Sequence, residues 1–177
     1  IEYAHLISAI MGDTGDCQKP DFKGVDFWFN QEVISALSRI KRHINSIQHL
    51  EIKDFFWVVF SMVVRKSSYI APGQILTARR KDWREIKQLT GPDTISLFKS
   101  IADEYLNYFE DFNRTASKDN FAKIIGTDAR KITLPRGVSS VDLILGSPPY
   151  INAMDYIWAN RLRLHWLELV KSDDDRL

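Results

Sequence analysis

Residues 142–150 read DLILGSPPY and constrain the fold more than any other stretch of this sequence. The run at 141–145 is short and almost wholly apolar, which is typical of a strand buried on both faces of a parallel sheet. Gly146 ends the run, and the two prolines that follow fix φ at about −65° and remove two backbone donors. The sequence therefore predicts an interior strand that ends in a stiff turn, at the sheet edge where ligands bind in open α/β folds.

The turn Ser147-Pro148-Pro149-Tyr150 resembles the catalytic motif of the S-adenosylmethionine-dependent amino methyltransferases. These DNA methylases modify the exocyclic nitrogen of cytosine or adenine, and the serine variant is similar to the motif of the cytosine group. The resemblance implies that all four residues are catalytic and that S-adenosylmethionine is the cofactor. It also implies that the substrate is double-stranded DNA whose target base is flipped out of the helix. The alternative is that a proline pair after a strand forms only a turn.

The chemistry of this motif follows from its atoms. An exocyclic amino nitrogen shares its lone pair with the base ring and becomes a good nucleophile only when that pair is localised. The Ser147 hydroxyl and the Pro148 carbonyl can each accept one amino hydrogen, and both bonds strengthen as positive charge grows on the nitrogen. Tyr150 can stack on the displaced base, and stacking worth about 1–3 kcal/mol offsets part of the cost of unstacking it.

A second apolar run, FAKIIGTDAR at residues 121–130, ends in a glycine and then an acid, and it predicts a neighbouring strand. Methylases that carry the turn often have an aspartate after the strand that precedes the catalytic one, where it accepts a hydrogen bond from the adenine amino group of the cofactor. Asp128 matches that position, so the resemblance implies a cofactor-binding role. The equal alternative is a turn aspartate that bonds to its own backbone.

The glycine-rich loop that lets a backbone approach a cofactor has no counterpart in this sequence, because no two glycines are separated by a single residue. We therefore expect the cofactor loop to lie outside this chain and the chain to be a piece of a longer protein. In the unpermuted order of the family the loop would precede Ile1. In the permuted order it would follow Leu177, and the assignment of Asp128 would then fail.

Composition indicates a globular protein that can bury a core, with 45% hydrophobic and 27% charged residues among 177. The single cysteine, Cys17, excludes an internal disulfide and fits a reducing compartment, so we expect a cytoplasmic location. The four histidines have no ligand spacing, and no metal site is expected. The longest apolar stretch, residues 55–64, is about half of the roughly 20 residues that a membrane span requires, so no membrane partner is expected.

The middle of the chain predicts a helical block. Asn30 is expected to cap a helix with Arg39, Lys41 and Arg42 facing outward and an apolar face that repeats at steps of four and three: Val33, Leu37, Ile40, Ile44 and Ile47. Residues 55–64, FFWVVFSMVV, are apolar all round and predict the central helix. Pro92 is expected to start a further helix whose repeating side chains pack in the core: Thr94, Phe98, Ile101, Tyr105, Tyr108 and Phe112.

Two more helices are expected nearer the ends of the chain, at residues 1–11 and 153–170, with Asn152 as a cap of the second. Arg161 and Arg163 lie two positions apart in this second helix and cannot share one of its faces. At most one of these two arginines is therefore expected to reach a phosphate.

The loop at 65–87 is basic. It holds seven Lys and Arg against two acids, a net charge of +5, whereas the whole chain carries +1. Such a segment suits contact with a phosphate backbone, and we expect its nucleic-acid-binding residues to be Arg79, Arg80, Lys81 and Arg84. The alternative is a charged loop that is simply solvated.

Together these patterns predict an α/β protein, a partial Rossmann-like methyltransferase sheet with a large helical insertion. Residues 1–23 would form a helix and loop attached to the catalytic fold, 24–112 the insertion with its basic loop, and 113–177 part of the catalytic domain. The expected activity is that of a site-specific DNA methyltransferase, and the sequence does not identify a restriction partner. Methylation of RNA or of a protein glutamine, and a non-catalytic nucleic-acid binding piece, are the alternatives.

Overall fold

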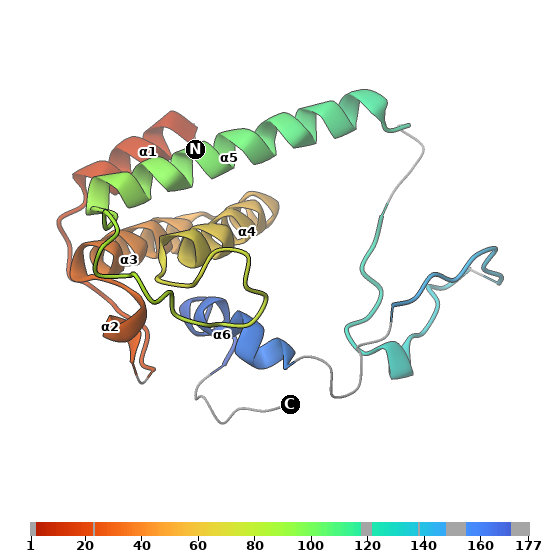
Figure 1. Ribbon diagram of the computed structural model, residues 1–177. Helices are drawn as coiled ribbons and strands as arrows, with labels where there is room; N and C mark the ends of the chain where they lie inside the picture. The colour runs from red at the N-terminus through yellow and green to blue at the C-terminus, as the bar shows by residue number, and fades with distance from the viewer. Residues whose placement is uncertain (1–2, 23, 118–121, 138, 148–154, 171–177) are drawn as a thin grey trace.

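The computed structural model describes residues 3–22, 24–117, 122–137, 139–147 and 155–170. These residues form helices joined by loops (Figure 1). The helices are α1 (Tyr3–Gly12), α2 (Val25–Trp28), α3 (Gln31–Ser46), α4 (Leu50–Ser67), α5 (Gly91–Thr115), the short 3-10 helix η1 (Ala129–Lys131) and α6 (Tyr156–Trp166).

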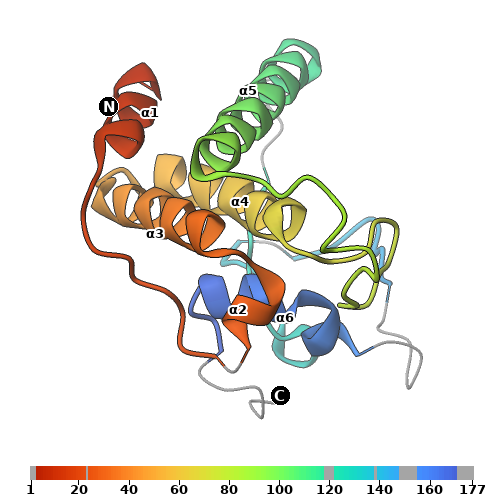
Figure 2. The ribbon, with the colours of Figure 1, turned by 60° about the vertical axis from the view of Figure 1, so that its left-hand side comes forward.

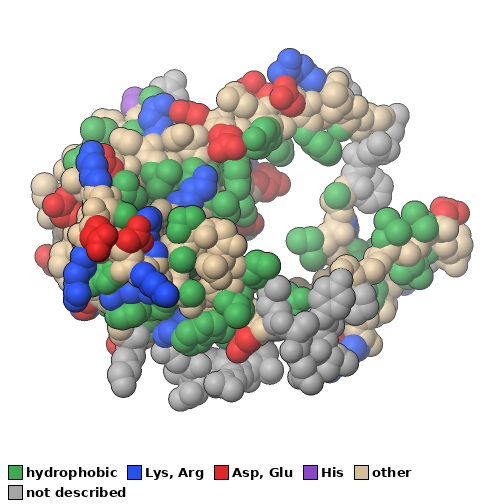
Figure 3. Space-filling model, in the orientation of Figure 1, with side chains coloured by type: hydrophobic (Ala, Val, Ile, Leu, Met, Phe, Trp, Pro, Cys, Tyr) green, Lys and Arg blue, Asp and Glu red, His purple; other side chains and the backbone are tan. Residues whose placement is uncertain are grey.

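The predicted α/β fold with a Rossmann-like sheet is wrong for the described part of the chain, which contains no β-strand. Its only β-type pairing there is an isolated antiparallel bridge between Ile70 and Arg79. Residues 122–137 and 139–147 instead lie apart from the α-helices as an extended arm with exposed apolar side chains (Figures 1 and 3). Ile144 and Leu145, expected in a buried strand, are 85% and 86% exposed.

The physical reason is that an apolar run becomes an interior strand only when neighbouring strands pair with both of its edges and helices cover both of its faces. Neither predicted strand has such a partner among the residues that the structure describes. An apolar run indicates a preference for burial, but it does not indicate whether the helices and strands that would cover it are present.

The helices pack in three layers around one core (Figures 1 and 2). Helices α3 and α4 form the middle layer, α1 and α5 cover one side of it, and α2 and α6 lie on the other side. The core takes side chains from early, middle and late parts of the chain, including Leu6, Phe60 and Trp166. The division at 1–23, 24–112 and 113–177 stays a prediction, and helices from all three segments share this core.

The start of α3 confirms the local prediction. The Asn30 side chain accepts a hydrogen bond from the amide of Val33 at 2.8 Å, and the five predicted apolar residues are buried. Lys41 was expected to face outward, and this is wrong. It lies in a buried position, where its ammonium donates to Glu168 at 2.6 Å, just beyond the end of α6. The long aliphatic stem lets a lysine cross the edge of a core and reach a carboxylate there.

Helices α4 and α5 are less completely buried than predicted. Helix α4 begins at Leu50, before the apolar run, and its Val58 is 54% exposed. Helix α5 begins at a capping box of Thr90 and Asp93, and Thr94, Phe98 and Ile101 are buried as expected. Tyr108 and Phe112, however, are 60% and 65% exposed, because the second half of this long helix extends past the bundle (Figure 1).

The helix expected at 153–170 is shorter in the structure. Helix α6 is capped by Asp155, whose side chain accepts from the amide of Trp158 at 2.8 Å. The predicted cap, Asn152, lies outside the described residues. Among the residues described, no helix is both long and apolar enough to cross a membrane.

Candidate nucleic-acid interface

The basic segment after α4 is a folded loop fixed to the bundle at several points. The amide of Tyr69 donates to the carbonyl of Trp28 at 2.9 Å, and the amide of Arg80 donates to the carbonyl of Tyr69 at 2.9 Å. The hydroxyl of Thr77, itself buried, donates to the carbonyl of Trp158 in α6 at 2.7 Å. The loop therefore presents its basic residues from a defined backbone.

Arg79 lies within an aromatic cage of this loop. Its guanidinium carbon is 3.5 Å from the ring centroid of Trp83, 3.9 Å from that of Phe27 and 5.3 Å from that of Tyr69. Such cation–π contacts stabilise the arginine where it sits. Partial burial lowers the pKa of Arg79 below the usual range, because desolvation disfavours its charge. Arg79 thus joins the loop to α2 through Phe27.

The other three predicted residues are arranged differently. Arg80 pairs with Asp82 through two hydrogen bonds of 2.7 Å, and these bonds lower the pKa of the Asp82 carboxyl. Lys81 and Arg84 are exposed, and within the described part of the chain neither forms an ion pair. Their charges are available to an anionic partner, as are those of the exposed Lys66 and Lys87 in the same loop.

The predicted catalytic turn is described only in part. Ser147, on the arm, is an exposed residue. Pro148, Pro149 and Tyr150 lie outside the described residues. Helix α6 begins shortly after them in the sequence and is anchored by Trp166 in the core.

Asp128 caps η1 on the same arm. Its carboxylate accepts from the amide of Arg130 at 3.0 Å and from two nitrogens of the Arg130 guanidinium, each at 2.9 Å. The guanidinium bonds, together with the amide, hold the pKa of Asp128 below its usual range. This is the local arrangement of a turn aspartate, and its cofactor-binding role remains a prediction.

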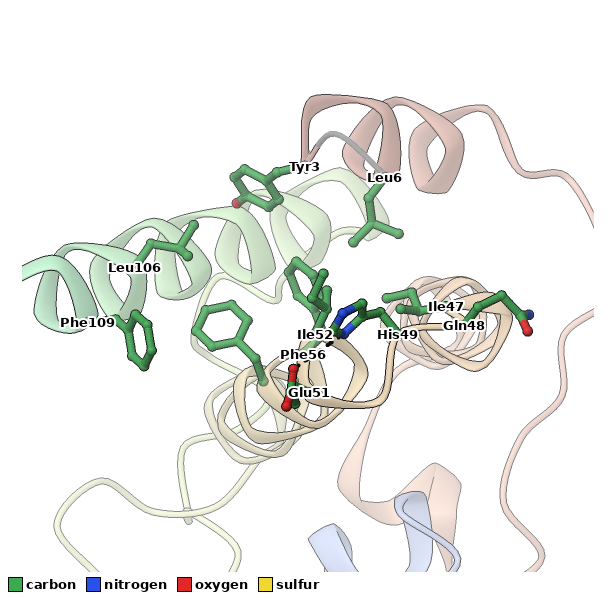
Figure 4. A pocket seen from close by; sticks show the side chains of 11 residues that line it. Tyr3, Leu6, Ile47, Gln48, His49, Glu51, Ile52, Phe56, Leu106 and Phe109 are labelled. Atoms are coloured by element: carbon green, nitrogen blue, oxygen red, sulfur yellow. Dashed lines mark ion pairs between the residues drawn. The ribbon is translucent and has the colours of Figure 1, made fainter. Parts of the chain in front are cut away.

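The structure also contains an apolar cavity of about 650 Å³ between α1, α4 and α5 (Figure 4). Phe55, Phe56 and Phe109 supply aromatic walls, and an ion pair of 3.6 Å between His49 and Glu51 lies beside it. None of the predicted site residues that the structure describes lines this cavity. Within the described ranges, no group of three or more His, Cys, Asp or Glu side chains could hold a metal ion.

A further cavity of about 490 Å³, lined by Arg65 and Arg163, was not found by sequence reasoning. In the sequence, Arg65 contributes to the charge of the basic loop, and Arg163 is one of two arginines in the helix expected at 153–170. The one sequence signal for this cavity is the spacing of Arg161 and Arg163, which lie two positions apart in a helix and so cannot both reach one phosphate. The structure separates the two: Arg163 faces this cavity, and Arg161 lies over the Trp158 ring at 4.5 Å.

Comparisons with known proteins give one informative similarity. No family model and no solved structure matches the chain. The Type II methyltransferase M.MvaI of Kocuria varians is 28% identical to it over 165 residues. This similarity covers 89% of the present chain and 36% of that protein, so the chain spans little more than a third of the length of its relative.

Proposed function

We propose that this chain is part of a site-specific DNA methyltransferase that transfers a methyl group from S-adenosylmethionine to an exocyclic amino group of cytosine or adenine. The similarity to a Type II methyltransferase over 89% of the chain is the observation that carries the proposal. Because the chain corresponds to 36% of that relative, the activity is proposed for the longer protein to which the chain would belong. The Type II class of the relative also supports a place in restriction-modification.

The turn at 147–150 would supply the groups that act on the base. The Ser147 hydroxyl and the Pro148 carbonyl would accept the two amino hydrogens, and Pro149 would keep the turn stiff. Tyr150 would stack on the flipped base. The exposure of Ser147 supports this assignment, because a hydroxyl buried against its own chain could not reach a substrate.

The described residues do not fit a complete site for S-adenosylmethionine. The carboxylate of Asp128 is occupied by the Arg130 guanidinium, so a cofactor amino group would have to displace an ion pair. The sequence also holds no glycine-rich loop. We therefore assign no step of cofactor binding to the described residues and expect the rest of the longer protein to supply it.

DNA would be held in part by the basic loop. Lys81 and Arg84 are exposed and would contact phosphates, while the paired Arg80 would contribute less. Arg79 would keep the loop in shape through its aromatic cage. Each phosphate that is neutralised adds salt-sensitive affinity that does not depend on base sequence.

The test is labelled-methyl transfer by the full-length protein to DNA, RNA and a glutamine-containing protein in parallel. We expect label on DNA, and we expect Tyr150→Ala to reduce the rate while Tyr150→Phe, which keeps the ring, retains most of it. Label on RNA or protein would instead favour those alternatives. Absence of transfer together with retained nucleic-acid binding would favour the non-catalytic alternative, which the missing glycine loop supports for the isolated chain.

A further inference from the structure

The cavity between the end of α4, the basic loop and α6 is lined by two arginines, Arg65 and Arg163. It measures about 490 Å³, within the range of small-ligand pockets, and its lining includes Arg65, Gln74, Asn160 and Arg163. Among the described residues that line it, none carries a carboxylate. Two arginines therefore line one cavity, and the described residues beside them are neutral, both polar and apolar.

The charge of Arg163 is poorly compensated in this position. Its two terminal nitrogens donate to weak neutral acceptors, the Asn160 side-chain oxygen at 3.3 Å and the Met62 sulfur at 3.5 Å. Its Nε is buried, and within the described residues it has no hydrogen-bond partner. Burial and the nearby charge of Arg65 both lower the pKa of Arg163. A half-buried cation with such surroundings is stabilised by an anion that enters the cavity.

The walls of the cavity are held in place without any ligand. The Arg65 guanidinium donates to the carbonyl of Gln74, which fixes the loop to the end of α4. The Thr77 hydroxyl fixes the same loop to α6 through the carbonyls of Trp158 and Ala159. Gly73 turns the loop between these points with a φ of +73°, a conformation that glycine adopts without strain. The two arginines are thus presented by a preformed frame.

We propose that this cavity is a subsite for one phosphodiester group of the nucleic-acid backbone, bound by Arg65 and Arg163 with help from the Asn160 side chain. The inference rests on the proposed function, since it takes nucleic acid as the substrate. The planar forks of arginine match phosphate oxygens, which favours this anion over a simple halide.

The experiment measures duplex-DNA binding by the full-length protein over a series of salt concentrations, using fluorescence anisotropy. Loss of one phosphate contact reduces the slope of log affinity against log salt by about 0.9. We expect the full reduction when Arg65 and Arg163 are both replaced by Gln, and a smaller reduction with weaker binding for Arg163→Gln and for Arg65→Gln alone, because both arginines hold the same phosphate. Arg163→Lys should keep the slope and lose affinity, because it retains the charge and not the fork.

The matched control is Arg114→Gln on α5, which removes the same charge from an exposed arginine paired with Asp111 at 2.6 Å. It should leave both slope and affinity unchanged. Circular dichroism identifies any variant that fails to fold, and Arg65→Gln and Arg163→Lys then test the cavity independently of Arg163→Gln. Slopes for the Arg65 and Arg163 variants equal to that of Arg114→Gln would overturn the subsite.

Methyl transfer by the wild-type protein, measured in parallel, separates the two proposals. Methylated DNA with unchanged slopes in the cavity variants would refute the subsite and leave the proposed function standing. Transfer to protein alone, with DNA binding that still weakens in Arg163→Gln, would refute the proposed function and support the subsite. A wild-type protein that binds no duplex DNA would refute both.

Discussion

Replacing Trp166 tests whether α6 is an integral part of the bundle. Its side chain is fully buried, and its ring meets Phe29 edge-on at 6.0 Å and Phe60 edge-on at 6.1 Å. Removing a buried tryptophan side chain loses its burial and leaves a cavity, so Trp166→Ala should lower the free energy of unfolding by about 3–5 kcal/mol. Urea unfolding of the chain, followed by far-UV circular dichroism, measures this loss.

Two variants sharpen the test. The indole Nε1 of Trp166 has no hydrogen-bond partner among the described residues, and an unpaired buried donor costs about 1–3 kcal/mol. Trp166→Phe removes this donor along with some apolar surface, so the net change should stay within about 1 kcal/mol. Trp158→Ala, on the same helix with the side chain 42% exposed, should cost no more than about 1 kcal/mol. Equal losses for Trp166→Ala and Trp158→Ala would refute the packing of α6 on the core.

Three further outcomes are expected. Thr90→Ala removes the capping box with Asp93 and should lower the free energy of unfolding by about 1 kcal/mol; an unchanged urea midpoint would contradict this. The amide of Gly15 donates to the Asp13 carboxylate at 2.7 Å and is the main cause of the lowered pKa of Asp13. The ionised carboxylate therefore stabilises the fold at pH values above its unfolded pKa of about 3.9. This stabilisation is lost as the pH falls through the lower pKa of the folded state. The free energies of unfolding of the wild type and Asp13→Asn should therefore differ most near neutral pH and least in strong acid. A difference that does not change with pH would be evidence against the bond between the Gly15 amide and the ionised Asp13 carboxylate. Arg84→Gln should weaken duplex-DNA binding by the full-length protein and reduce the slope of log affinity against log salt by about 0.9. Arg80→Gln should reduce this slope less, because Arg80 is already paired with Asp82. Equal slopes for the two variants would be evidence against phosphate binding by Arg84.

Local signals in the sequence predicted local structure well. Asn30 caps α3 as expected, because the capping bond to Val33 involves only neighbouring residues. The apolar rhythm of α3 and of the first half of α5 also places the buried side chains correctly. The position of Lys41 could not be predicted this way, because its partner Glu168 is distant in sequence and only the packing of α6 brings the two together.

The errors concern features that depend on distant partners. An interior strand at 141–145 requires other strands to pair along both of its edges. The apolar residues of that run do not indicate whether such strands are present. Tyr108 and Phe112 continue the helical rhythm of α5 but extend past the helices that would cover them. The cavity of Arg65 and Arg163 is formed by three separate segments, and no single stretch of sequence contains its pattern.

The proposed role of the turn at 147–150 is to prepare an exocyclic amino group for methylation. The most direct measurement is to incubate the full-length protein with duplex DNA and labelled S-adenosylmethionine, digest the product to nucleosides, and locate the methyl group by mass spectrometry. We expect label on the exocyclic nitrogen of cytosine or adenine, and much less label with Ser147→Ala. Label on a ring carbon of cytosine, or equal label with Ser147→Ala, would contradict it.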